Sequence, residues 1–201
     1  LDKPPHMVST ACCSAVRRLF NARRAGHAGT LDPLATGLLP IALNAATRAM
    51  RFLVDSSKSY RFNVQFGAET DTDDALGTVT RRATALPVRV TREQLEAVLG
   101  KYRNARFDQM PPQFCARRVN GERAHAIARR GGVADLKPTA VTVTKFDIEQ
   151  LDDESATLVA HVSKGTYVRS LARDIGRDLG CFAHVTALRR LTFASWTEED
   201  A

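Results

Sequence analysis

Residues 60–66 read YRFNVQF, in which every second side chain is apolar, from Tyr60 to Phe66. Because successive side chains of a β-strand point to opposite faces, this alternation predicts a strand with one buried and one solvated face. Three further segments have the composition of strands: 141–151, 157–162 and 191–196. The chain is therefore expected to build a sheet around half-buried strands.

Helices are expected between these strands. The stretch TREQ at 91–94 is a capping box that opens one helix, and Thr166 is expected to cap another, which Gly180 closes. Two more helices are expected, one over 45–54 and one that Ser9 or Thr10 caps, with an apolar stripe comprising Cys12, Val16, Leu19 and Phe20. Because helices and strands alternate without a regular βαβ rhythm, an α+β fold with a mixed sheet is predicted rather than a doubly wound one.

The composition is that of a globular protein with a basic surface. The chain has 201 residues, and 29 lysines and arginines against 22 aspartates and glutamates give it a formal net charge of +7. Such a charge favours a polyanionic partner, most often nucleic acid, although a basic surface can also serve solubility alone. No apolar run approaches the roughly 18 residues of a membrane-spanning helix, so no membrane partner is expected.

The sequence contains no recognisable cofactor or metal motif. The acidic stretch TDTDDALG at 70–77 lacks the glycine and glutamate positions of a calcium-binding EF-hand loop. There is no Walker phosphate loop, no G-x-G-x-x-G, and no metal-binding spacing among the five histidines. The four cysteines include no C-x-x-C pair and indicate reduced thiols in the cytoplasm. We therefore expect neither a cofactor nor a metal.

One aspartate lies in a stiff, glycine-rich loop. The stretch GHAGTLDPLATG at 26–37 contains three glycines, and Pro33 restricts the backbone of Asp32. Such a carboxylate is either a turn residue or a fixed nucleophile. A second stretch, SKGTYVRS at 163–170, offers Arg169, whose forked donors can hold both oxygens of a buried carboxylate. This stretch and a third, SKSYRF at 57–62, also present the polar side chains Lys164, Tyr167 and Tyr60.

The segment from Pro111 to Gly132 differs from the rest of the chain in its charge. It begins with two prolines and carries five arginines, which are Arg117, Arg118, Arg123, Arg129 and Arg130. Such a segment is a candidate mobile arm that contacts phosphates, and it is equally compatible with an exposed helix of surplus charge.

Three long motifs occur in an order typical of one enzyme family. They read GHAGTLDPLATGLLP, KSYRFNVQFGAETDTDDALG and SKGTYVRSLARDIGRDLGCFAHVTALRR, with LDKP before them and PPQFCARRVNGERAHAIARRGG between the last two. From Leu1 to about Phe193 the chain resembles the TruB family of tRNA pseudouridine-55 synthases, in the stand-alone bacterial form. The resemblance implies the α+β pseudouridine synthase fold, with a central mixed, mostly antiparallel sheet flanked by helices and loops. It also implies one catalytic domain over 1–201 with a mobile RNA-clamping arm at about 111–137, the family's C-terminal RNA-binding domain being absent or truncated.

The resemblance implies an activity and roles for individual residues. Members isomerise uridine in the T loop of tRNA without a cofactor: the C1′–N1 bond breaks, the base turns, and C5 bonds to C1′. Asp32 matches the catalytic aspartate, Arg169 its partner, and Tyr60 the tyrosine that stacks on the target base and is proposed to remove the C5 proton. The residues matching the uridine pocket are Tyr167, His27 and Leu188, and the candidate RNA contacts are Lys164, Arg117 and Arg118. Attack at C1′, addition at C6 and a glycal intermediate all remain open.

Two further alternatives follow from the residues themselves. A non-catalytic protein that binds or folds RNA in the same cleft is of another class, and Asp32 separates the two, because a pure binder has no need of an aspartate there. On periodicity alone, Tyr60 and Leu188 would be ordinary core residues. The expected partner is the T arm of tRNA, bound by a monomeric protein.

The chain departs from the family pattern at several positions. His6 and Asn44 stand where the family usually has glycine, and Phe114, Cys115 and His125 replace residues that are usually tyrosine or serine. None of these is among the residues matched to catalysis, so the departures bear on RNA contacts of the arm rather than on the implied activity. Arg173 and Arg177 have aspartates directly after them, at 174 and 178, and are expected to form surface ion pairs.

Overall fold

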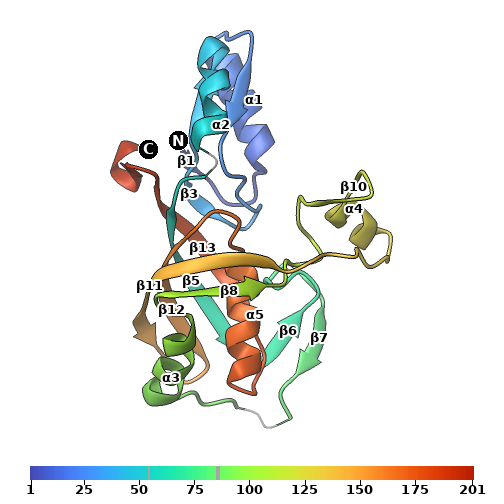
Figure 1. The fold of residues 1–201 in the computed structure, drawn as a ribbon, viewed down its shortest axis with the longest axis vertical. Helices are drawn as coiled ribbons and strands as arrows, with labels where there is room; N and C mark the ends of the chain where they lie inside the picture. Colours follow the sequence, from blue (N-terminus) through green and yellow to red (C-terminus); the bar gives the residue numbers. More distant parts are fainter. Residues whose placement is uncertain (54, 85–86) are drawn as a thin grey trace.

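The computed structural model describes residues 1–53, 55–84 and 87–201, and its centre is one mixed β-sheet (Figure 1). The strands run in the order β1-β3-β13-β5-β12-β11-β8, with β14 paired to β13 beside that path. Their bounds are β1 Asp2–Lys3, β3 Thr36–Leu38, β13 Ala183–Phe193, β5 Lys58–Phe66, β12 Ser155–Val162, β11 Thr139–Leu151, β8 Ala105–Gln109 and β14 Trp196–Thr197. Neighbouring strands of the described sheet are antiparallel except β3 and β13, which are parallel. The predicted α+β fold with a mixed, mostly antiparallel sheet is confirmed.

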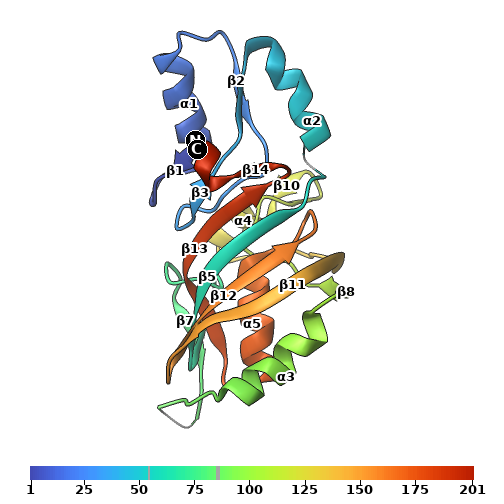
Figure 2. The ribbon, with the colours of Figure 1, turned by 90° about the vertical axis from the view of Figure 1, so that its left-hand side faces the viewer.

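β5 lies in the middle of the sheet and has the two faces that its sequence predicts. It pairs with β12 on one side and β13 on the other, and its apolar side chains, from Tyr60 to Phe66, are buried. On the opposite, polar face, Arg61 binds Glu149 through two hydrogen bonds of 2.7 and 2.8 Å. The buried face is covered by helices α5 Val168–Asp178 and α3 Arg92–Tyr102; α5 lies behind the sheet in Figure 2, and α3 lies at its lower end.

The two helices begin, end and pack for reasons that are visible in the sequence. Thr91 accepts a hydrogen bond from the backbone N–H of Gln94, so the capping box of α3 is confirmed. Gly180, with φ of +72°, follows the end of α5 as predicted. The inward face of α5 includes Leu171 and Ile175, which are fully buried, and burial of each is worth about 1.5–3 kcal/mol.

The N-terminal part of the chain forms a small lobe at the upper end of the sheet (Figure 1). Its remaining elements are α1 Ser9–Leu19, β2 Ala25–His27, β4 Ile41–Leu43, the 3-10 helix η1 Asn44–Ala49 and α2 Met50–Leu53. Arg190 of β13 is fully buried and donates hydrogen bonds to the carbonyls of Leu38 (2.7 Å) and Gly29 (2.8 Å). This side chain therefore ties the loop that carries Asp32, together with the end of β3, to β13.

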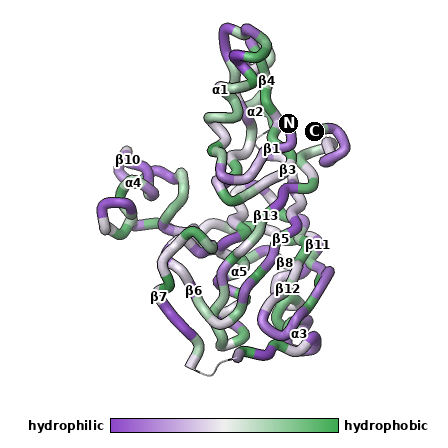
Figure 3. The backbone as a smooth tube through the Cα atoms, turned by 180° about the vertical axis from the view of Figure 1, so that it is seen from behind, coloured by the Kyte–Doolittle hydropathy of each residue, from purple (hydrophilic) through white to green (hydrophobic). Residues whose placement is uncertain are grey.

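Residues 111–137, which we call the arm, project from the side of the body (Figure 1). The arm contains β9 Arg118–Val119, β10 Glu122–Arg123 and α4 Ala124–Arg129, packed around the apolar side chains of Cys115, Ala124, Ala134 and Leu136. Hydrophilic and hydrophobic stretches alternate along it in Figure 3. It is therefore a small folded unit with its own apolar cluster, rather than a single exposed helix. The other described elements are β6 Ala68–Thr70, β7 Val79–Arg82 and η2 Glu198–Asp200.

Two predicted helix caps are wrong, because the hydroxyl groups concerned bond elsewhere. α1 begins after Val8, and the Ser9 hydroxyl exchanges two hydrogen bonds with the backbone of Leu31. α5 begins after Tyr167, and the Thr166 hydroxyl instead donates to the carbonyl of Ser163 at 3.0 Å. In both cases a tertiary or turn contact replaces the local cap.

Other predicted boundaries also differ from the structure. The inward stripe of α1 ends early: Leu19 and Phe20 are 79% and 66% exposed, because only the first turns of this helix lie against a buried surface. The strand predicted at 191–196 begins at residue 183 and is ended by Ala194, whose φ of +54° turns the chain into β14. The helix predicted over 45–54 is η1 followed by α2, and its last residue lies outside the described residues.

The close approach of β3 and β13 predicts an unequal response of two glycines to alanine. Gly37 and Gly180 both have positive φ, which costs alanine about 1–2 kcal/mol, but a Cβ on Gly37 would also lie 2.3 Å from the Arg190 carbonyl oxygen. We expect Gly37→Ala to lose about 1–3 kcal/mol more than Gly180→Ala, which is the usual cost of forced overpacking. Urea unfolding measures both, and equal losses would contradict the close strand contact.

Candidate active site

A pocket of about 800 Å³ opens where the lobe, the sheet and the arm meet. Segments from distant parts of the chain line it, and all six residues that the family resemblance matches to catalysis and uridine binding are among them. These are His27, Asp32, Tyr60, Tyr167, Arg169 and Leu188. The structure therefore brings together side chains that are spread over more than 160 positions of the sequence.

The loop around Asp32 is held on both sides by buried polar side chains. Ser9 fixes Leu31 through bonds of 3.0 and 2.9 Å, directly before the aspartate. Lys3, which is fully buried, donates to the carbonyls of Pro4 and Met7 and, at 3.4 Å, to that of Pro33, directly after it. Burial lowers the pKa of Lys3, and the negative charge of Asp32 partly offsets this by raising it. These contacts remove freedom that the proline alone would leave to the loop.

Arg169 holds the carboxylate of Asp32 in a two-pronged ion pair. Its Nε donates to Oδ2 at 2.8 Å and its Nη2 to Oδ1 at 3.0 Å. The arginine side chain is 4% exposed, whereas that of Asp32 is 34% exposed. The carboxylate therefore faces the pocket, and the guanidinium lies behind it. Burial lowers the pKa of Arg169, but the carboxylates of Asp32 and Asp74 outweigh it, and the net pKa is raised.

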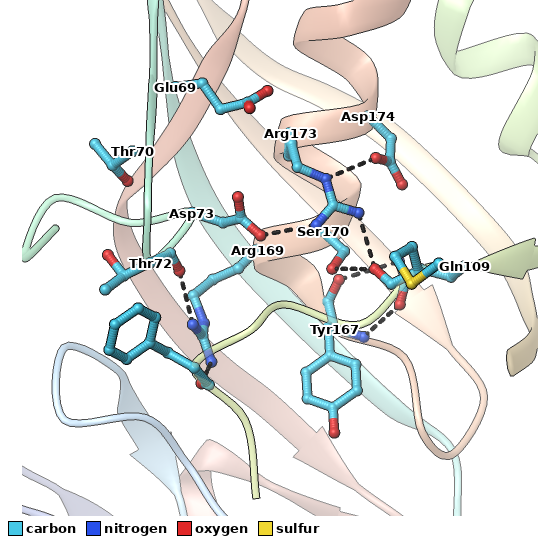
Figure 4. Close-up of polar contacts among 12 residues, drawn as sticks. Glu69, Thr70, Thr72, Asp73, Gln109, Tyr167, Arg169, Ser170, Arg173 and Asp174 are labelled. Carbon is cyan, nitrogen blue, oxygen red and sulfur yellow. Dashed lines mark hydrogen bonds and ion pairs between the residues drawn. The ribbon is translucent and has the colours of Figure 1, made fainter. Parts of the chain in front are cut away.

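The same guanidinium also fixes two other segments. Arg169 donates to the carbonyl of Thr72 at 2.7 Å and to that of Phe114, at the start of the arm, at 3.0 Å. Figure 4 shows it reaching from α5 toward the 70–74 segment. The aspartate loop, the acidic segment and the arm are therefore joined through one side chain.

The arginines further along α5 continue this arrangement, which corrects the prediction that they form only surface pairs. Arg173 is buried, and although it bonds Asp174, its Nη1 also binds Asp73 at 2.9 Å (Figure 4). Arg177 binds Glu69 through two bonds of 2.7 Å. The reason is helix geometry: residues four apart share one face, and this face lies against the acidic stretch 69–74. Burial raises the pKa of Asp73 to about 6, although the arginines oppose it.

Two tyrosines, a leucine and a histidine are part of the pocket wall. Tyr60 and Leu188 are buried in the main core and also line the pocket, so the core role that periodicity predicts and the pocket role coexist. Both ends of the Gln109 side-chain amide bond the backbone of Tyr167, which fixes the start of α5 (Figure 4). Burial and the charge of Arg190 lower the pKa of His27, which favours the neutral ring.

The three RNA-contact candidates lie outside this pocket. Lys164 forms an ion pair with Asp55 at 2.8 Å. Arg117 donates to Lys137 and Thr139, and Arg118 donates to the carbonyl of Gly121, so both are engaged within or beside the arm. The arginines of the arm that line the pocket are instead Arg123 and Arg129, with His125 beside them in the lining. Sequence spacing identified the arginines of the arm but not the face on which each one lies.

Lys58 also lines the pocket, although the sequence motifs assign it no role. It begins β5, two residues before Tyr60, and its ammonium donates to the carbonyl of Ser56 at 2.6 Å and lies 4.7 Å from the centre of the Phe193 ring. Burial, and to a smaller extent the charge of Arg190, lowers the pKa of Lys58 to about 8. The sequence could have indicated this role, because Lys58 is two residues before Tyr60 and therefore lies on the same face of the strand.

Two further properties concern only the part of the chain that is described. Over 1–53, 55–84 and 87–201, no helix has the length and apolar character needed to cross a membrane. The same ranges contain no cluster of three or more histidine, cysteine, aspartate or glutamate side chains suited to a metal ion. All four cysteines are buried free thiols.

Similarity to solved structures defines the class of fold. A Cbf5–Nop10–Gar1 complex includes a chain with TM-score 0.75 and 25% identity, matched over 99% of this chain and 49% of that one. An H/ACA ribonucleoprotein bound to a substrate RNA containing 2′-deoxyuridine includes one with TM-score 0.72 and 24% identity, matched over 99% and 48%. The fold is that of the pseudouridine synthases.

Sequence comparison identifies the family within that class. Residues 17–168 match the family model of the TruB family pseudouridylate synthase N-terminal domain, and residues 169–201 match the tRNA pseudouridylate synthase B C-terminal domain. The chain belongs to the TruB family. The division falls at the start of α5, yet β13, beyond it, pairs with β5, before it, so both matched ranges contribute to one sheet.

Named relatives are bacterial and longer than this chain. Proteins called tRNA pseudouridine synthase B are 47% identical in Brucella anthropi and 45% identical in Bartonella henselae, each over the whole chain. The chain spans 61% and 62% of the length of these two relatives.

The buried ammonium of Lys58 predicts a pH dependence of stability. Because its pKa of about 8 in the folded protein lies below the usual 10.5, the folded state binds fewer protons than the unfolded chain between these values, and stability rises with pH there. We expect the free energy of unfolding of the parent to gain up to roughly 3 kcal/mol relative to Lys58→Met between pH 7 and 10.5. Urea unfolding across this range measures the difference. Lys137→Met, at an exposed position, is the control; the same pH response in both variants would contradict the burial argument.

Proposed function

We propose that this chain carries the catalytic site of a tRNA pseudouridine synthase, which isomerises uridine to pseudouridine at position 55 in the T loop. The observation that carries the proposal is the Asp32 carboxylate, held by a buried arginine through both oxygens while its open side faces a pocket walled by Tyr60. Membership of the TruB family and relatives named tRNA pseudouridine synthase B support it.

The reaction requires one carboxylate near the ribose and no added atom. The C1′–N1 bond of uridine breaks, the uracil leaves with the electron pair and turns, and C5 forms the new bond to C1′; C5 then loses a proton and N1 gains one. Hydrolytic glycosidases generally use two carboxylates, one of which activates water or attacks the sugar. A site with Asp32 as the acidic group facing the sugar suits a transfer in which water has no part.

Arg169 is assigned the role of positioning the carboxylate. Each carboxylate oxygen that accepts one of its hydrogen bonds retains a second lone pair, which can be directed at C1′ or at a ribose proton. Since the guanidinium is buried behind Asp32 and also bonds Thr72 and Phe114, the acid cannot turn away from the pocket without losing a charge-assisted pair. Preorganisation of this kind is a recurrent source of catalysis.

The pocket accounts for how a stacked uridine reaches the acid. A base inside a folded loop must be extruded, which costs a few kcal/mol, and stacking on aromatic side chains offsets that cost. Tyr60 and Tyr167 supply aromatic surfaces within the pocket, and its volume is within the range of small-ligand sites. Tyr60 is assigned the stacking role, and Tyr167, His27 and Leu188 are assigned to the wall around the base.

A non-catalytic RNA-binding role for the same cleft is not favoured. It would leave unexplained why Lys3 and Ser9 fix the backbone on either side of Asp32 while Arg169 holds its carboxylate at the pocket. We also propose that the protein acts on the T arm of tRNA as a monomer in the cytoplasm. The family resemblance supports the T arm, and the four free thiols suit a reducing compartment.

Replacement of the acid tests the assignment. Asp32→Asn keeps the shape of the side chain, and Arg169 retains its bonds to two carbonyls, so we expect the variant to fold and to bind tRNA. It should release no tritium from tRNA labelled at C5 of uridine, whereas the parent should release it at the target position. Equal release by both proteins would rule out Asp32 as the catalytic group; no release by the parent would defeat the proposed reaction itself.

The arm predicts a difference between two pairs of arginines. Arg123 and Arg129 line the pocket, whereas Arg117 and Arg118 are hydrogen-bonded to the arm and its base. We expect Arg123→Ala/Arg129→Ala to flatten the dependence of log affinity for tRNA on log salt by about 1 to 2, because each lost phosphate contact removes about 0.7–0.9 from the slope. Arg117→Ala/Arg118→Ala carries the same charge change and should flatten it less. The reverse order would assign the RNA contacts to the second pair.

A further inference from the structure

A second hollow, of about 690 Å³, adjoins the pocket on the lobe. Residues of α1 and β2 line this hollow, which we call the groove, and Thr47 of η1 also contributes to the lining. Thr10 and His27 line both the groove and the pocket, so the two form one continuous depression. None of the residues matched to catalysis, other than the pocket-wall histidine, lies in the groove. Its lining is therefore an unassigned extension of the site.

The groove is basic, and none of the described residues that line it is acidic. Between residues 3 and 53 the chain contains six arginines and one lysine but a single acidic residue, Asp32, whose carboxylate is engaged by Arg169. Three of the arginines, Arg17, Arg23 and Arg24, line the groove with exposed side chains. Their guanidinium groups form no ion pair or hydrogen bond with other described residues. Such a concave arrangement attracts phosphate groups.

The loop that carries two of these arginines is held in place by Asn44. Its side-chain oxygen accepts hydrogen bonds from the backbone N–H groups of Arg23 at 2.9 Å and Arg24 at 3.3 Å, and the backbone N–H of Asn44 donates to the Arg24 carbonyl at 3.0 Å. Asn44 has a φ of +50°, a conformation that asparagine tolerates. A glycine here could make the same turn but would supply no such acceptor. Asn44 therefore fixes the backbone from which the side chains of Arg23 and Arg24 extend.

We propose that this groove binds the sugar–phosphate backbone of the RNA strand adjoining the nucleotide in the pocket, with phosphates contacting Arg17, Arg23 and Arg24. The inference rests on the proposed function for the identity of the partner. Continuity with the pocket sets the path of the strand, because a chain leaving a base near His27 enters the groove directly. The hydroxyl groups of Thr10 and Ser14, on α1, supply uncharged donors along the same wall.

The groove predicts a local electrostatic effect on RNA binding. In Arg17→Ala/Arg23→Ala/Arg24→Ala, three phosphate contacts of a single strand are lost, so the slope of log affinity for an unmodified tRNA transcript against log salt should fall by about 2. KM should rise far more than kcat falls, because these side chains do not touch the acid. The matched control, Arg82→Ala/Arg92→Ala/Arg106→Ala, removes the same charge from exposed positions on β7, α3 and β8. Equal slopes for the two triple variants would overturn the proposal.

Neutral phosphate analogues distinguish contact in the groove from a general loss of charge. Methylphosphonate replacement of the phosphates nearest the target uridine should weaken binding to the parent and to the control variant, but should cause no further loss in the groove variant. Additive losses would show that these phosphates are bound elsewhere and would overturn the proposal. Because these measurements follow binding, they are independent of turnover: a parent that binds but forms no pseudouridine would defeat the proposed function and leave the groove intact.

Asn44→Gly tests the positioning of the loop. The backbone turn remains available to glycine, but the acceptor for Arg23 and Arg24 is lost, so KM for the transcript should rise several-fold with kcat little affected and the melting temperature near that of the parent. In the groove variant background the same change should have no further effect on KM. An equal rise in both backgrounds would assign Asn44 a purely structural role and remove it from the proposal.

Discussion

The guanidinium of Arg169 is the constraint on which the site depends. Buried at the start of α5, it donates to both oxygens of Asp32 and to two backbone carbonyls, one from the 70–74 segment and one from the start of the arm. A buried arginine without these partners would be strongly unfavourable, so the three segments and the helix are mutually dependent. The catalytic geometry proposed for the aspartate is thus a property of the whole body rather than of its loop.

A second buried arginine, Arg190, positions the lobe, as Arg169 positions the site. Arg190 lies in β13, the strand that runs beside both β3 and β5, and its hydrogen bonds cross to the carbonyls of Leu38 and Gly29. The close contact at Gly37 leaves no room for a side chain between these strands. Together they place the lobe, with its basic groove, directly above the pocket, so that an RNA strand can meet the acid and the groove at the same time.

Much of the architecture could be predicted from local pattern. The alternation of 60–66, the capping box at Thr91 and the glycine after α5 all appear as expected, because each depends on contacts within a few residues. The hydroxyl groups of Ser9 and Thr166 could not be placed in this way. Each has a local cap available and uses a different partner, and for Ser9 that partner lies 22 residues away.

The sequence by itself determined the family, the fold class and the six pocket residues that the motifs match to catalysis and uridine binding, because long ordered motifs specify them without reference to their neighbours in space. Tertiary structure alone decided where each side chain points and which residues it contacts. It turns Arg123 and Arg129 toward the pocket and Arg117 away, places Arg173 against Asp73, and joins the pocket to the groove beside Asn44. The physical reason is that the orientation and burial of a side chain depend on which elements pack together. The spacing of residues along the sequence does not specify that packing.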